Sequence, residues 1–315
     1  MRLSGVRAWG GLLLGLAAAL APAAAAADPP ACRAVRFADI GWVDVSATTA
    51  VAARILRDLG YQPRISDLPI AATYQGLKAG TVDAFLGNWM PAMAAERKPY
   101  LDDKSIDVLG PNLEGAKFTL AVPQYTWDKG LHDFQDIQKF GQELDWKIYG
   151  IEPGNDGNRH ILDLIHAKRW GLEKFQLVEG SEQSMLAQLA KDYRAHRPIV
   201  FLGWEPHPMN IRYKIAYLTG GDDTFGPDFG AESVYTNIRA GYATECPNVA
   251  KFLGNLKFTL TAEDTLMADI LDRRMDPERA ARTWLRGNRD VLPDWLEDVT
   301  TFDGRPGLRV VQARR

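Results

Sequence analysis

The sequence has few of the features that mark enzymes and nucleic-acid-binding proteins. Among its 315 residues are only two cysteines and five histidines, and 37 basic residues stand against 40 acidic ones. Because binding to a phosphate backbone requires an excess of positive charge, we expect no nucleic-acid partner. No G-x-S-x-G, H-E-x-x-H, G-x-x-x-x-G-K or G-x-G-x-x-G motif occurs, and no metal-ligand spacing stands out among the histidines. We therefore predict a binding protein that is not an enzyme and uses neither cofactor nor metal.

Long apolar runs are also scarce, and the one that exists lies at the N-terminus. It covers residues 12–27, follows Arg2 and Arg7, and ends in a row of alanines. This pattern is typical of a secretory signal peptide, so we predict cleavage of residues 1–27 and a periplasmic mature protein. A membrane anchor is the alternative, although the run is shorter than the ~20 residues of a spanning helix. Cleavage removes two arginines and no acid, which takes the net charge from -3 to -5.

The two cysteines, Cys32 and Cys246, both lie beyond the predicted cleavage site. In an exported protein they meet an oxidising compartment, so a single disulfide is the economical interpretation. Two independent buried thiols are the alternative, and a metal site is disfavoured because C-x-x-C spacing is absent. A disulfide would place the first and last thirds of the mature chain in one lobe.

Beyond residue 34, short β-rich runs alternate with stretches of helical periodicity. We predict strands at residues 35–40, 62–66, 82–86, 118–122, 147–151, 175–178, 199–202 and 234–238. We predict helices from an N-cap at Ser46 to residue 59, then at 70–79, after 91, at 133–142, 158–168 and 182–195, and several near the C-terminus. A loop is predicted at residues 220–230.

This alternation predicts an α/β fold with parallel-type sheets, in which ligands bind beyond the carboxyl ends of strands. It restarts after Gly110-Pro111, which indicates a second unit. With the predicted disulfide, that unit is inserted in the first: residues 29–111 and 219–315 form one lobe, and residues 112–218 form the other. Two crossover segments would join the lobes, and hinge closure between them would trap a small ligand.

Tryptophan is abundant, with nine residues, and three of them follow predicted strands. These are Trp42, Trp89 and Trp204, and each comes shortly after a glycine. A single loop tryptophan is more often structural, but three spread over both lobes indicate a ligand site in the cleft. Tryptophan faces bind cations that cannot donate hydrogen bonds, such as quaternary ammonium groups. Asp44 would supply the opposite charge.

At these residues the chain resembles a known family, the periplasmic substrate-binding proteins of glycine betaine and choline importers of the ABC type. The motifs that carry the resemblance are Gly41-Trp42-Val43-Asp44, Leu86-Gly87-Asn88-Trp89-Met90-Pro91, Ile148-Tyr149-Gly150-Ile151-Glu152-Pro153-Gly154 and Gly203-Trp204-Glu205-Pro206-His207. The likeness covers nearly the whole mature chain and is greatest to the choline-binding members. It implies a type II periplasmic binding protein with one disulfide and a four-sided aromatic box.

The resemblance also implies a set of ligand-binding residues. Matching the motifs gives Trp42, Trp89 and Trp204 as three walls of the box, with Asp44 and Asn155 as polar partners. Phe118 would be the fourth wall, where the family leads us to expect tyrosine. Loss of that hydroxyl keeps the ring face but removes a possible hydrogen bond.

The polar partners favour choline over glycine betaine. A betaine carboxylate would be repelled by Asp44, whereas the hydroxyl of choline can donate to Asp44 and pair with Asn155. A helix N-terminus predicted at residues 155–158 argues for an anion instead. Asp156 there could be a ligand residue, but an aspartate at a helix N-terminus is more often a cap. The predicted function is choline capture for an inner-membrane ABC permease by a monomer. Binding of glycine betaine or proline betaine, and a sensory role with the same ligands, are the alternatives.

Overall fold

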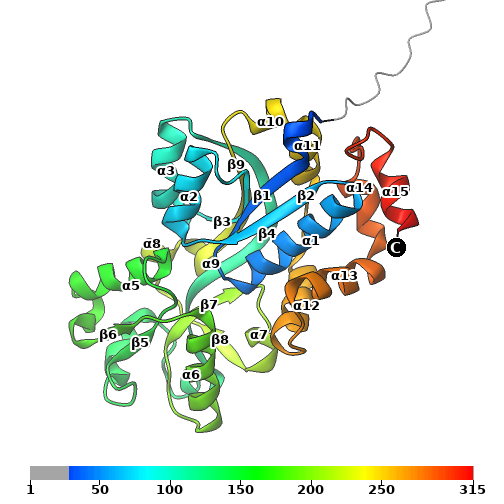
Figure 1. The fold of residues 1–315 in the computed structure, drawn as a ribbon. Helices are drawn as coiled ribbons and strands as arrows, with labels where there is room; N and C mark the ends of the chain where they lie inside the picture. The colour runs from blue at the N-terminus through cyan, green and yellow to red at the C-terminus, as the bar shows by residue number, and fades with distance from the viewer. Residues whose placement is uncertain (1–27, 315) are drawn as a thin grey trace, which may run out of the picture.

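The computed structural model describes residues 28–314 (Figure 1). The predicted signal peptide, residues 1–27, lies outside the described residues. Within the described part of the chain, no helix is both long enough and apolar enough to cross a membrane.

Figure 1 shows two lobes, an upper one that contains β1 to β3 and a lower one that contains β5 to β8. Across residues 28–314 the strands form a nine-stranded sheet with the order β2-β1-β3-β9-β4-β7-β5-β6, and β8 pairs with β4. The strands are β1 Ala34–Asp39, β2 Gln62–Asp67, β3 Ala84–Met90, β4 Ile106–Pro123, β5 Lys147–Tyr149, β6 Gln176–Val178, β7 Phe201–Glu205, β8 Ile215–Tyr217 and β9 Ala231–Arg239.

The sheet is mixed, although each lobe contains the parallel strands that the sequence predicted. β1 pairs in parallel with β2 and β3, and β5 pairs in parallel with β6 and β7. β4 and β9 run antiparallel to their neighbours. β4 is 18 residues long and serves both lobes, because its first part pairs with β9 and its last part with β7 and β8. The two-lobed α/β architecture is therefore confirmed.

Helices surround the sheet in both lobes (Figure 1). The α-helices are α1 Val43–Asp58, α2 Ile70–Ala79, α3 Ala94–Asp102, α4 Gln124–Trp127, α5 Asp156–His166, α6 Glu182–Arg194, α7 Met209–Arg212, α8 Asp222–Phe225, α9 Pro227–Gly230, α10 Tyr242–Glu245, α11 Pro247–Asn255, α12 Leu260–Leu271, α13 Pro277–Gly287, α14 Leu292–Trp295 and α15 Gly307–Ala313. Short 3-10 helices are η1 Pro30–Arg33, η2 Phe134–Phe140, η3 Arg169–Lys174 and η4 Arg289–Val291.

Helix α1 is largely buried, and two predicted site residues lie at its N-terminus. Its alanines at 47, 50, 52 and 53 are buried, and the helix packs against α12 and α13. Small side chains allow neighbouring elements to approach closely. The start of α1 is thereby held in place from several sides.

Several predicted boundaries are wrong for local reasons. The predicted N-cap at Ser46 lies inside α1, because its hydroxyl donates to Asp39 Oδ2 at 2.7 Å instead of capping the helix. The strand predicted at 118–122 begins at residue 106, since β4 continues through Gly110-Pro111 with register shifts. The predicted 220–230 loop contains the two short helices α8 and α9. The helix predicted at 133–142 is the shorter 3-10 helix η2.

The predicted disulfide is present, and joins Cys32 in η1 to Cys246 at the start of α11. Next to it, the carboxylate of Asp28 accepts the backbone N–H groups of Asn248 and Val249, and the hydroxyl of Tyr61 donates to it at 2.9 Å. The start of the described chain is therefore attached to α11 by a covalent bond and by buried hydrogen bonds.

Reduction of this disulfide is expected to lower the free energy of unfolding by about 2–4 kcal/mol, because it frees a long loop in the unfolded chain. Ligand affinity should change less than twofold, since neither cysteine lines the cavity described below. Urea unfolding with and without a reductant, paired with ligand titration, measures both quantities. An unchanged urea midpoint would show that the hydrogen bonds around Asp28 maintain stability without the disulfide.

Candidate functional site

A small cavity lies between the two lobes. It is lined by Trp42, Asp44, Trp89, Phe118, Ile151, Asp156 and Trp204. Five of the six residues that the sequence nominated for ligand binding are in this group. The sixth, Asn155, directly precedes the lining residue Asp156 in the sequence. Residues from distant parts of the chain therefore meet at one place.

The aromatic side chains come from α1 and from three strands. Trp42 is the N-cap residue of α1. The sequence placed Trp89 and Trp204 in loops after strands, and this is wrong, because β3 and β7 extend to include them. Both strands are held by pairing at these positions: Trp89 lies opposite Val234 of β9, and Trp204 lies opposite Phe118 of β4.

The rings of Trp42, Trp89, Phe118 and Trp204, which we call the aromatic box, are all less than 9% exposed. The ring centroid of Phe118 lies 6.3 Å from that of Trp89 and 6.5 Å from that of Trp204, at angles of 56° and 64°. Rings at these distances and angles make inclined, edge-to-face contacts with one another.

Phe118 is also tightly flanked by α5. A Cβ atom on Gly157 would lie 2.5 Å from the tip of its ring, so only glycine allows α5 to approach this closely.

Two buried carboxyl groups face the box. Asp44 is 4% exposed and accepts the indole N–H of Trp89 at 3.0 Å. Burial, with a smaller contribution from the nearby Glu182, raises the pKa of Asp44 to about 7. Burial also raises the pKa of Asp156 to about 7. Among residues 28–314, no Arg, Lys or His side chain lines this cavity, so the lining has negative charge available and no fixed positive charge.

For Asp156 the sequence left two roles open, a ligand residue and a helix cap, and favoured the cap. The cap of α5 is instead Asn155, whose side-chain oxygen accepts the backbone N–H of Asn158 at 3.2 Å. This leaves the carboxyl of Asp156 free to line the cavity. The side-chain amide of Asn155 lies 3.4 Å from Asp156 Oδ1 and is buried. Nothing in the sequence pattern distinguishes a capping residue from its successor when both are Asn or Asp.

Ile151 was missed by the sequence reasoning, because a single aliphatic residue after β5 carries no signal of its own.

The two lobes are in direct contact around the cavity. The indole N–H of Trp42 donates to Glu152 Oε1 at 2.6 Å, and Arg159 of α5 pairs with Glu96 of α3 at 3.2 Å. On another side Arg212 of α7 forms a salt bridge with Asp272, which follows α12. These contacts join the two lobes at three places. In the described part of the chain, no group of three or more His, Cys, Asp or Glu side chains has the arrangement of a metal site.

Two α/β lobes that enclose a small cavity between them define a solute-binding protein of the periplasmic type. Residues 33–287 match the family described as the substrate binding domain of ABC-type glycine betaine transport systems. The chain belongs to this family, whose members bind solutes for ABC transporters and are not enzymes.

Solved structures of similar proteins support the same family assignment. An ABC-transporter choline binding protein in complex with choline is 51% identical, with a TM-score of 0.89 over 91% of this chain and 99% of that one. An unliganded, semi-closed choline binding protein, also 51% identical, gives a TM-score of 0.83 over 90% of this chain and 99% of that one. Lactococcal OpuAC, closed around glycine betaine, is 26% identical, with a TM-score of 0.76 over 83% of this chain and 98% of that one.

Replacing Asp44 by asparagine is expected to stabilise the ligand-free protein at pH 8 by about 1–3 kcal/mol, since the raised pKa of Asp44 means that its ionisation opposes folding. The folded-state pKa lies above the unfolded value, so this penalty grows as the pH rises toward 7. The gain should therefore be clearly smaller at pH 5. Urea unfolding of both proteins at both pH values measures it.

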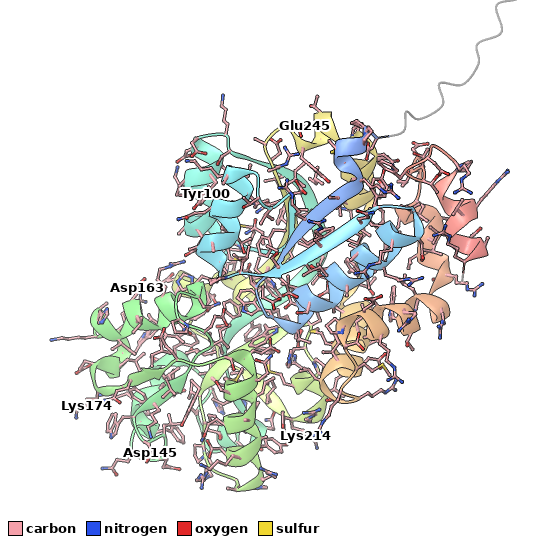
Figure 2. The ribbon with its side chains drawn as sticks, viewed as in Figure 1. Tyr100, Asp145, Asp163, Lys174, Lys214 and Glu245 are labelled. Carbon is pink, nitrogen blue, oxygen red and sulfur yellow. A yellow bond between two sulfur atoms is a disulfide. The ribbon has the colours of Figure 1, made fainter. Side chains whose placement is uncertain are left out.

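A matched control for this substitution is Asp145→Asn, which makes the same change at an exposed carboxylate at the outer end of the second lobe (Figure 2). It should alter stability by less than 0.5 kcal/mol, as surface substitutions usually do. Equal effects of Asp44→Asn at pH 5 and pH 8 would show that the Asp44 carboxyl is not the source of the penalty.

Proposed function

We propose that this protein captures choline in the cavity between its lobes and delivers it to an ABC importer. The observation that carries the proposal is the composition of the cavity: four aromatic rings and two carboxyl groups, with no basic side chain among the lining residues that the structure describes. A quaternary ammonium group cannot donate an N–H bond, so ring faces and carboxylates are the partners that suit it. The 51% identity to a choline binding protein supports this choice.

The aromatic box supplies a large part of the binding free energy, but not all of it. Four desolvated cation–π contacts at up to ~2 kcal/mol each give about 8 kcal/mol before the costs of ordering. Micromolar binding needs about 8 kcal/mol net. The box alone therefore falls short once association costs are counted. Attraction to Asp44 and Asp156 inside the closed cleft supplies the difference.

The polar residues favour choline over a betaine. The hydroxyl of choline can donate to a carboxylate such as Asp156 or pair with the amide of Asn155, which lies next to it. A betaine carboxylate would instead lie among carboxyl groups without a basic partner. Glycine betaine remains the second candidate, because the 26% identical OpuAC binds it and because the N-terminus of α5 offers free N–H groups to an anion.

We further propose that the lobes consist of residues 29–111 with 219–315 and of residues 112–218. The first boundary falls within β4, which pairs with strands of both lobes. Trp42, Asp44 and Trp89 then belong to one lobe, and Phe118, Asn155 and Trp204 to the other. Only closure brings all these residues together, so ligand binding favours the closed form.

The setting that we propose is the periplasm, reached by cleavage of residues 1–27. The protein would act as a monomer that presents its closed form to an inner-membrane permease. A sensory protein that presents the same closed form to a receptor is the alternative. An uptake assay with a strain that lacks the protein distinguishes the two roles.

Calorimetric titration of the oxidised protein is expected to show choline binding at micromolar affinity or tighter. Glycine betaine should bind at least tenfold more weakly, because its carboxylate meets Asp44 and Asp156. Tryptophan fluorescence should change in parallel, since three of the box residues are tryptophans. Tighter binding of betaine would keep the family assignment but overturn the assigned ligand, and absence of binding by either compound would overturn the aromatic box.

Choline binding is also expected to release protons below pH 7. A bound cation favours the ionised forms of Asp44 and Asp156, whose pKa values in the empty cavity are about 7. At pH 6 both carboxyls must lose protons as the cation enters, so affinity should fall several-fold between pH 8 and pH 6. Calorimetry at pH 6 in buffers of different ionisation enthalpy counts the protons, and Asp44→Asn should reduce that count. An enthalpy that does not depend on the buffer would exclude the linkage.

A further inference from the structure

Glu182 is the first residue of α6 and is only 2% exposed, yet it does not line the cavity. Its two carboxylate oxygens accept hydrogen bonds from opposite sides of the cleft. Oε2 accepts the backbone N–H of Val43 in α1 at 3.1 Å, and Oε1 is 3.2 Å from Nε2 of His207, which follows β7. We call these two contacts the Glu182 bridge.

The histidine contact has a defined direction. Nδ1 of His207 accepts the backbone N–H of Met209 at 3.0 Å, so the proton of the neutral ring is on Nε2. That proton is therefore donated to Glu182. The ring of His207 is 1% exposed and lies edge-on to Trp204, with centroids 5.0 Å apart.

The Glu182 bridge thus connects two walls of the box. Val43 stands between Trp42 and Asp44 in the sequence, and His207 packs on Trp204. We propose that Glu182 is a positioning residue that holds the two lobes in the closed arrangement and thereby slows ligand release. This inference rests on the closure described in the proposed function. In an open form the Val43 N–H would move away with its lobe, and the Glu182 carboxylate would face solvent.

A carboxylate suits this position for two reasons. Both of its oxygens accept hydrogen bonds, whereas a glutamine would turn an NH₂ group toward either Val43 or His207 and leave that donor unpaired. The first turn of α6 also favours negative charge, because its free N–H groups point toward the start of the helix.

The donor side of the bridge can be removed without changing Glu182. Val43 is the first residue of α1, and its N–H makes no hydrogen bond within the helix. Proline is well tolerated at this position, and Trp42 before it has the extended conformation that proline requires, with φ of -80° and ψ of 139°. Val43→Pro therefore removes the N–H that Glu182 accepts while it keeps a small apolar side chain.

Stopped-flow fluorescence with choline tests the proposal. Glu182→Gln and Val43→Pro should each speed dissociation at least tenfold, which corresponds to about 1.4 kcal/mol, while association changes less than threefold. Glu173→Gln, the same change at an exposed residue of the same lobe, should alter neither rate by more than twofold. Dissociation within twofold of the wild type in both bridge variants would overturn the proposal.

A second measurement needs no ligand and so separates the bridge from the choline assignment. Spin labels at Lys98→Cys in α3 and Lys174→Cys in η3, both exposed, report the distance between the lobes. Figure 2 places Lys174 at the outer end of the lower lobe. Either bridge variant should shift the distances toward a more open form, with or without choline. Unchanged distances in both variants would overturn the bridge even if choline binds. If the variants show the shift but the wild type does not bind choline, only the assigned ligand is overturned.

Discussion

The burial of carboxyl groups without basic partners is the constraint that shapes the centre of this protein. Asp44 and Asp156 are each less than 5% exposed and lie at the interface of the lobes. Glu263 of α12 lies nearby, and burial together with Asp44 raises its pKa well above the ordinary value. Such groups either take up protons or need a cation. The aromatic box provides a place for that cation, and hydrogen-bond donors from both lobes stabilise Glu182.

The sheet supplies the framework on which this arrangement depends. Phe118 and Trp204 are partners across β4 and β7, while Trp89 is held by β3 against β9. β4 pairs with both β7 and β9, so a single strand sets the spacing of the two lobes. The box residues from strands are therefore placed by regular ladders, and Trp42 is placed by its position at the start of α1.

The sequence allowed much of the site to be predicted, because each tryptophan lies in a short motif beside glycine or proline. Prediction failed where one local sequence pattern is compatible with two different local structures. Asn155 and Asp156 are both good capping residues, and only the fold decides which of them caps α5 and which lines the cavity. Serine is a typical N-cap residue, but the hydroxyl of Ser46 donates a hydrogen bond to Asp39 instead of capping the helix. Gly110-Pro111 looks like the end of a loop before a strand, yet β4 continues through it with register shifts. Glu182 was not nominated because its partners are a distant main-chain N–H and a histidine 25 residues away.

The position of β9 in the sheet has a consequence for how the chain reaches its native state. β9 lies between β3 and β4, and α13 packs on α1, so the core of the upper lobe combines residues from both ends of the described chain. During synthesis, the sheet of β1 to β3 cannot be completed until residues 231–287 have been made. The strands β5 to β7 and their helices are contiguous in sequence and have no such delay. The middle of the chain, which contains β5 to β7, is therefore able to fold before the sheet of β1 to β3 has been completed by the C-terminal residues.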